Sequence, residues 1–447
     1  MRRSLSRRLA IAGTTLAVLF AGVPAAQAAE QSAVNHGGGH GSKYLNVGYF
    51  TQWGIYGRAF YVKNLETSGA AAKLTHINYA FGDVNAEGKC ASADSWADYQ
   101  RPVPAEESVD GVADTWGAPL NGNLGQLKKL KAKHKNLKVL ISLGGWTLSD
   151  HFSDAVLTPE SRRKFVESCV DLFIKGNLPS LGEGESGGPG SGAGVFDGID
   201  LDWEWPGWPG EPGNTVRPED KQNFTAVLQE FRKQLDAYGR SQRKKYELTA
   251  FLPANPKAID AGLEVKKIFR YLDFATLQGY DFHGSWETMT NQQSALRVPA
   301  RSPDEVDFSG ELTVKAYVDR GAPRKQLVLG IPYYGQGWTG VTGGGDGLYK
   351  QATGPAPATW QAGFEDYKVL KDLAKNGSFK VYRDLRNGHA WLFDGTTFWT
   401  YDDPVVVLQK TQFIRKERLG GAMVWSLDGD DANATLTKTI ALGLSRR

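Results

Sequence analysis

FDGIDLDWEWP, at residues 196–206, has the composition of a β-strand but carries four carboxylates. Ile, Leu and Trp alternate with the acids, and an ordinary buried strand does not tolerate so many charges. Side chains alternate between the two faces of a strand, so Asp200, Asp202 and Glu204 point the same way, each about 6.6 Å from the next. We therefore predict that this face carries out chemistry.

Three carboxylates at this spacing cannot all be ionised, and repulsion and burial raise the pKa of at least one of them. We predict Glu204 as the resulting proton donor, because it stands where the strand ends before Trp205-Pro206-Gly207. Asp197 has the opposite parity, and we predict it as a structural acid that caps backbone amides. A metal site and a solvated acidic edge strand are the alternatives. Apolar residues between the acids do not fit a calcium loop, so no metal or cofactor is predicted.

The rest of the chain alternates strands with helices. An amphipathic helix at 218–238, with apolar residues spaced for one face, follows the acidic strand directly. Eight strands in such an order predict an α/β fold, a (β/α)8 TIM barrel, whose active site lies at the C-terminal ends of the strands. The predicted strands are Tyr44–Phe50, Leu74–Phe81, Lys138–Ser142, the acidic stretch, Tyr246–Phe251, Phe274–Tyr280, Gln326–Ile331 and Ala422–Trp425.

Four motifs fall at those strand ends, in order along the chain: SLGGW at 142–146, D-x-x-D-x-D-x-E at 197–204, GYD at 279–281 and GAMVWS at 421–426. Together they resemble glycoside hydrolase family 18, the retaining chitinases, over about residues 44–444. The resemblance implies hydrolysis of chitin and N-acetylglucosamine oligosaccharides, in which the 2-acetamido oxygen of the sugar replaces an enzyme nucleophile.

The same resemblance assigns roles around the predicted acid. Asp202 accepts the acetamide N–H, and Asp200 shares a proton with it. Tyr280 donates to the acetamide oxygen. Tyr49 and Ser142 hold Asp200 in the barrel floor.

Five further residues are implied in substrate binding. Asp281 contacts the sugar in the cleaving subsite, Trp425 forms its apolar floor, and Trp146 and Trp53 stack sugars on either side. For each Trp, ordinary core packing is the alternative. Gln278 departs from the family pattern, because many relatives carry Met there, and its amide lies near the acetamide or the leaving sugar.

The chain divides into five predicted segments. Residues 1–28 have a basic start, an apolar core and a small-x-small cleavage site, typical of a secretory signal peptide. Residues 29–43 form a Gly-rich, flexible leader. The barrel comprises 44–338 and 399–447. Residues 339–398 hold their own short strands and a helix, and resemble the chitinase insertion domain, a small α+β domain between strand 7 and helix 7.

Composition limits the partners. Removing the signal peptide takes away four Arg and no acids, so the formal charge falls from +3 to −1. We therefore predict a secreted monomer with no nucleic-acid or membrane partner. Cys90 and Cys169 either pair in a disulfide or stay as buried thiols.

Two rival functions share the fold. Endo-β-N-acetylglucosaminidases use the same acid on N-glycan cores, and release of such glycans without cleavage of chitin oligomers would identify one. Non-catalytic chitin-binding lectins typically lack the acid, which is present here as Glu204.

Overall fold

The computed structural model describes residues 44–180, 182 and 185–446. The predicted signal peptide and leader lie outside these residues. No helix in the described part of the chain combines the length and the apolar composition needed to cross a membrane.

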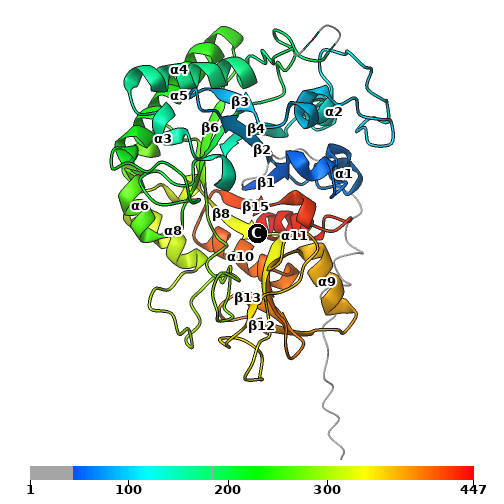
Figure 1. Cartoon of the computed structure of the whole chain (residues 1–447), viewed down its shortest axis with the longest axis vertical. Coiled ribbons are helices and arrows are strands. Elements are labelled where there is room, and N and C mark those ends of the chain that lie inside the picture. The colour runs from blue at the N-terminus through cyan, green and yellow to red at the C-terminus, as the bar shows by residue number, and fades with distance from the viewer. Residues whose placement is uncertain (1–43, 181, 183–184, 447) are drawn as a thin grey trace, which may run out of the picture. The chain divides into compact units, whose positions relative to one another are not determined.

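Eight parallel strands form a closed barrel surrounded by helices, which confirms the predicted (β/α)8 fold (Figure 1). The barrel closes because β1 pairs on one side with β2 and on the other with β15. The barrel strands are β1 (Leu45–Thr51), β2 (His76–Val84), β4 (Lys138–Gly144), β5 (Gly198–Asp202), β6 (Glu247–Leu252), β7 (Phe274–Leu277), β8 (Leu327–Pro332) and β15 (Gly421–Trp425).

The helices follow from local signals in the sequence. Helix α5 buries the five apolar residues of its predicted face, each at most 1% exposed. Asp403 caps α10, since its carboxylate accepts hydrogen bonds from two backbone N–H groups of the first turn. The α-helices of the barrel and its loops are α1 (Val62–Thr67), α2 (Gly122–Lys133), α3 (Phe152–Ala155), α4 (Pro159–Cys169), α5 (Asp220–Gln242), α6 (Pro256–Gly262), α7 (Val265–Ile268), α8 (Gly310–Asp319), α10 (Pro404–Lys416) and α11 (Thr435–Ser445).

Short helical turns complete the loops. Three of them come after barrel strands, so they line the C-terminal end of the barrel: η2 follows β1, η4 follows β4 and η7 follows β15. The 3-10 turns are η2 (Gln52–Ile55), η4 (Trp146–Leu148), η6 (Arg324–Gln326) and η7 (Leu427–Gly429), and the π turns are η3 (Trp96–Gln100) and η5 (Val170–Ile174).

A second, antiparallel sheet lies between β8 and α10, with α9 (Tyr367–Lys375) beside it (Figure 1). The predicted boundaries 338/339 and 398/399 fall inside β9 and β14, so this sheet extends beyond the predicted segment at both ends. Its strands are β9 (Tyr334–Thr339), β10 (Gly354–Pro355), β11 (Phe364–Asp366), β12 (Lys380–Asp384), β13 (His389–Phe393) and β14 (Phe398–Tyr401).

The two cysteines form a disulfide with a Cα–Cα distance of 4.9 Å. It joins α4 to β3 (Cys90–Ser92), which pairs antiparallel with the end of β2. Of the two alternatives left open by the sequence, the buried free thiol is therefore wrong. The bridge closes a separation of 79 residues, which restricts the unfolded chain.

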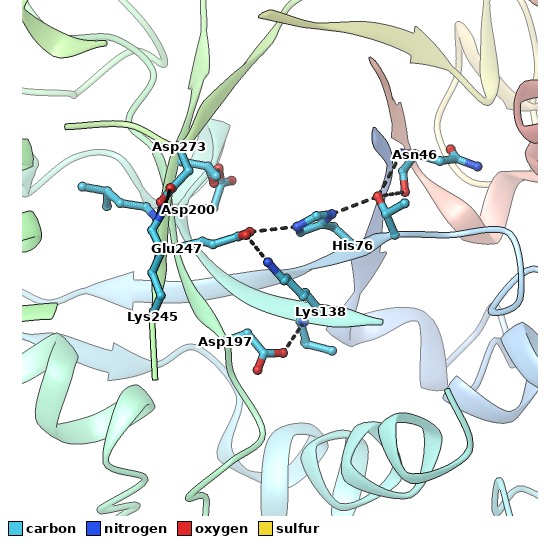
Figure 2. Close-up of polar contacts among 12 residues, drawn as sticks. Asn46, His76, Lys138, Asp197, Asp200, Lys245, Glu247 and Asp273 are labelled. Carbon is cyan, nitrogen blue, oxygen red and sulfur yellow. Dashed lines mark hydrogen bonds and ion pairs between the residues drawn. The ribbon is translucent and has the colours of Figure 1, made fainter. Parts of the chain in front are cut away.

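Ion pairs tie together the N-terminal ends of the barrel strands. His76, Lys138 and Glu247 are each the first residue of a strand. The Glu247 carboxylate contacts both Lys138 Nζ and His76 Nε2, the latter at 2.8 Å (Figure 2). Burial opposes ionisation of Glu247, but the hydrogen bonds and charges of these partners prevail and lower its pKa to about 2.

Asp197 lies at this same end, one residue before β5 (Figure 2). Its carboxylate accepts a 3.0 Å hydrogen bond from the Val139 N–H and lies 2.7 Å from the Nζ atoms of both Lys131 and Lys244. Burial favours the neutral acid, but the two lysines outweigh it and lower the Asp197 pKa.

Candidate active site

Asp200 is held in the barrel floor by hydroxyl groups from three strands. Tyr49 on β1 and Ser142 on β4 each donate a 2.8 Å hydrogen bond to Oδ2, and Thr249 on β6 donates to Oδ1 at 2.5 Å. The strand register places Ser142 and Thr249 directly beside Asp200. Burial raises the pKa of Asp200, and the hydroxyl donors partly offset that rise.

Asp202 is one step further along β5, and it is 3% exposed. Its Oδ1 atom is buried and has no hydrogen-bond partner among the described residues. Burial, together with the charges of Glu204 and Asp200, raises its pKa well above the ordinary value. An unpaired buried acceptor is costly, so this oxygen is suited to receive a donor from a bound molecule.

Glu204 stands two residues beyond the end of β5. Its backbone N–H donates a 3.0 Å hydrogen bond to the Ser149 hydroxyl, which itself donates to the Gly145 carbonyl at 2.8 Å. Burial and the charge of Asp281 raise the Glu204 pKa to about 8. The carboxyl group is therefore a proton donor at neutral pH.

Tyr280 and Asp281 follow β7. Tyr280 is buried, stacks on Phe251 and has its hydroxyl 3.7 Å from Met423 Sδ. Asp281 has a φ of 54°, a left-handed conformation that is uncommon outside glycine. Its Oδ1 accepts a 2.9 Å hydrogen bond from Gln336 on β9.

These four carboxylates have no ion-pair partner. Among the described residues, no Lys, Arg or His nitrogen lies within 4.0 Å of Asp200, Asp202, Glu204 or Asp281, and none contributes to their pKa shifts. No group of three or more His, Cys, Asp or Glu side chains in that part of the chain is arranged to hold a metal ion. Among the described residues, only neutral groups donate hydrogen bonds to these four carboxylates.

Aromatic rings surround the carboxylates. Trp425, at the end of β15, stacks on Phe81 with ring centroids 5.6 Å apart and lies 6.4 Å from Trp53. Trp53 is 40% exposed and Trp146 is 48% exposed. Neither ring is packed in the core, so both present a face to solvent at the C-terminal end of the barrel.

The side-chain oxygen of Gln278 already accepts a hydrogen bond from within the chain. Its Oε1 accepts a 3.0 Å hydrogen bond from the Ala254 N–H, and no contact ties its NH₂ group to another described residue. Asp197 is the one predicted site residue that the structure places at the opposite end of the barrel.

Sequence reasoning missed three supporting residues: Thr249, Ser149 and Gln336. A weak sequence signal exists for Thr249, because it is the residue of β6 that pairs with Asp200 of β5. Ser149 follows η4 in a loop, and Gln336 comes from the second sheet, so no local pattern links either residue to the acids.

Comparison with known proteins shows which family the chain resembles over most of its length. The family model for glycosyl hydrolases family 18 matches residues 46–430. Chitinase C of Streptomyces lividans is 40% identical over 409 residues, which cover 89% of this chain and 60% of that protein. The solved catalytic domain of psychrophilic chitinase B from Arthrobacter TAD20 is 47% identical, with a TM-score of 0.85, and the match covers 90% of this chain and 95% of that one.

A more distant structure carries a ligand. It is catalytic domain 2 of the Group II chitinase of Ostrinia furnacalis, as a mutant in complex with penta-N-acetylchitooctaose, and is 29% identical with a TM-score of 0.71 over 89% of this chain and 95% of that one. The present chain spans about 60% of the length of the curated bacterial relatives that it matches.

Proposed function

The chain belongs to glycoside hydrolase family 18, and from this premise we propose that it is a secreted chitinase. It hydrolyses β-1,4 linkages between N-acetylglucosamine units in chitin and chitooligosaccharides, and the products keep the anomeric configuration. The observation that carries this proposal is the pairing of Glu204, which holds a proton near neutral pH, with Asp202, whose buried Oδ1 has no partner among the described residues.

The first step breaks the glycosidic bond. Glu204 donates its proton to the bridging oxygen, and the carbonyl oxygen of the substrate's 2-acetamido group attacks the anomeric carbon. Asp202 Oδ1 accepts the acetamide N–H and stabilises the positive charge of the oxazolinium ring. The Tyr280 hydroxyl donates to the acetamide oxygen and holds it in line for attack.

The second step restores the enzyme. Glu204, now ionised, takes a proton from a water molecule that attacks the anomeric carbon from the side of the departed sugar. The ring opens, the acetamide is regenerated and the new hydroxyl has the original configuration. Asp200, fixed by Tyr49, Ser142 and Thr249, exchanges a proton with Asp202 as charge builds and decays above it.

The aromatic residues bind the polymer. Trp425 is the apolar floor of the cleaving subsite, Asp281 contacts the sugar bound there, and Trp53 and Trp146 stack sugars on either side. The second sheet, between β8 and α10, raises one wall of the site and favours long substrates. Gln278 directs its NH₂ group to the acetamide or to the leaving sugar. We also propose that the protein is exported by residues 1–28 and acts as a monomer.

A timed digestion of the N-acetylglucosamine hexamer, with the anomers of the products resolved, tests this function. We expect β-anomeric dimers and trimers first, and no products from Glu204→Gln. The matched control is Glu247→Gln, which makes the same change at the opposite end of the barrel and should still cleave. Survival of the wild-type hexamer, or α-anomeric initial products, would refute the proposal.

The assisted mechanism has its own test. A thiazoline analogue of the oxazoline intermediate presents the same bicyclic ring without being hydrolysed, so it should inhibit the wild type competitively. Asp202→Asn should bind it more weakly, because a neutral amide stabilises the ring charge less. Absence of inhibition would count against participation of the acetamide.

A further inference from the structure

Two residues of the second sheet, Tyr334 and Gln336 of β9, reach the carboxylate site. Gln336, on β9, is 6% exposed, and its Nε2 donates a 2.9 Å hydrogen bond to Asp281 Oδ1. Register fixes its place, because Gln336 pairs with Phe364 of β11 on one side and Thr400 of β14 on the other. The pairing of three strands therefore fixes the position of the Gln336 backbone.

The backbone around Asp281 is fastened to the same sheet. Gln293 Nε2 donates to the Tyr334 carbonyl at 2.8 Å, and the Gln293 carbonyl accepts the Phe282 N–H at 3.0 Å. The Asp281 N–H itself donates a 3.4 Å hydrogen bond to Gln293 Oε1, while Gln336 and the Tyr334 hydroxyl act on its carboxylate. None of these groups carries a charge.

The titratable groups that act on Glu204 or Asp281 are Asp202 on β5, Tyr280 after β7 and Tyr334 on β9. Asp200 on β5 and Tyr49 on β1 act in turn on Asp202 and Tyr280. All are acids or phenols, and no cation from the described residues lies among them. Burial raises the pKa of Asp281 as well, and no cation among the described residues offsets the effect of its charge on Glu204.

We propose that Gln336 is a positioning residue that fixes Asp281 beside Glu204 while leaving the Asp281 charge uncompensated, and that it thereby sets the upper pH limit of the proton donor. A cation at position 336 would make the same hydrogen bond but cancel the charge. This inference rests on the proposed role of Glu204 as the acid.

The direction of the effect follows from linkage. Burial and the Asp281 charge raise the Glu204 pKa to about 8, so the wild-type donor stays protonated up to that pH. Cancelling the Asp281 charge stabilises ionised Glu204, which lowers its pKa. The alkaline limb of the pH profile of kcat/KM should then move to lower pH.

The test compares Gln336→Arg with the wild type on the N-acetylglucosamine hexamer across pH 5–10. We expect both proteins to cleave, with the alkaline limb of Gln336→Arg shifted down by about one pH unit. The control is Gln242→Arg, which adds the same charge at the exposed C-terminal end of α5. Its profile should match that of the wild type. An active Gln336→Arg with an unshifted limb would overturn the proposal, as would an equal shift in the control.

A second readout does not depend on turnover. An infrared titration follows the protonated carboxyl band that Glu204→Gln removes, and its midpoint should fall in Gln336→Arg and in Asp281→Asn. If the wild type fails to cleave chitin oligomers, the proposed function is wrong, but this titration still decides the role of Gln336. If Gln336→Arg does not fold, Gln336→Lys carries the same charge. An unchanged midpoint in the folded variants would refute the inference.

Discussion

The two ends of the barrel hold similar carboxylates in opposite electrostatic settings. At the N-terminal end, Glu247 contacts Lys138 and His76, Asp197 contacts Lys131 and Lys244, and the pKa values of both acids are lowered. At the C-terminal end, Asp202 and Glu204 have no such basic partner among the described residues, and their pKa values are raised. Asp197 and Glu204 flank the same five-residue strand, β5.

Burial alone does not separate the two ends, because it raises the pKa of acids at both. The difference lies in the partners: Lys and His at one end, and hydroxyl, phenol and amide groups at the other. The first arrangement stabilises the fold with fixed charges, and the second keeps protons available. A TIM barrel concentrates its chemistry at the C-terminal face in this way.

The largest expected effect on activity comes from replacing one acid at each end of the barrel by Gln and comparing the two variants. Glu204→Gln should lower kcat by about three orders of magnitude, because proton donation is lost. Affinity for the hexamer, measured by calorimetry, should persist because the subsite contacts remain. Glu247→Gln should keep kcat within about twofold. Comparable losses in both variants would break the contrast between the ends.

A smaller loss of activity should follow from the neighbouring acid. Asp202→Asn keeps the shape of the side chain but loses the negative charge that stabilises the oxazolinium ion, so kcat should fall by about 10²-fold. Tyr280→Phe, which removes one neutral hydrogen bond, should lose less, about tenfold. Steady-state kinetics on the hexamer measure both. A larger loss in Tyr280→Phe than in Asp202→Asn would reverse the assigned roles.

The two ends should also differ in the sign of their effect on stability. Glu247 has a pKa lowered from 4.5 to about 2, so it contributes stability above pH 4.5 that is lost as the pH falls toward 2. Glu247→Gln should lower the free energy of unfolding at pH 7 by about 2–3 kcal/mol. Chemical denaturation at pH 7 and pH 3 measures the free energy of unfolding of both proteins. The difference between the variant and the wild type should be smaller at pH 3.

Glu204 behaves in the opposite way. Its pKa is raised from 4.5 to about 8, so the wild type loses stability as the pH rises through that interval. Glu204→Gln removes this pH-dependent loss of stability. Its melting temperature should therefore be higher than that of the wild type at pH 8 and equal to it at pH 4. A lower melting temperature at pH 8 would show that ionised Glu204 is stabilised by an interaction that the geometry does not contain.

The disulfide should have the smallest effect on the site. Replacing Cys90 and Cys169 together by Ala should lower the free energy of unfolding by about 2–4 kcal/mol, because the unfolded chain gains freedom. It adds no charge near Glu204, so the pH profile of kcat/KM should not move. A shifted alkaline limb would mean that the charge environment of Glu204 depends on this bridge.

Much of this arrangement could be predicted from the sequence, because two periodic signals were strong. The alternation of acids with Ile, Leu and Trp placed Asp200 and Asp202 on one face of a strand, and both point into the barrel. The alternation of strands and helices predicted the barrel itself. Both signals are local, so they survive without knowledge of tertiary contacts.

The supporting contacts could not be predicted, because they join residues far apart in the chain. Gln336 reaches Asp281 across 55 positions, and Thr249 reaches Asp200 across 49. The disulfide was undecided for the same reason, since its 79-residue separation says nothing about distance. The predicted boundaries 338/339 and 398/399 fall inside β9 and β14, because a strand that runs through a boundary carries no local signal at that point.

The most direct test of the contrast between the two ends is the protonation state of Glu204 in the wild-type protein at pH 7. Infrared difference spectra against Glu204→Gln isolate its carboxyl band, and spectra against Glu247→Gln isolate that of Glu247. We predict a protonated carboxyl for Glu204, with a titration midpoint near pH 8, and an ionised carboxylate for Glu247. An ionised Glu204 at pH 7 would contradict the account, because the site would then lack its proton donor.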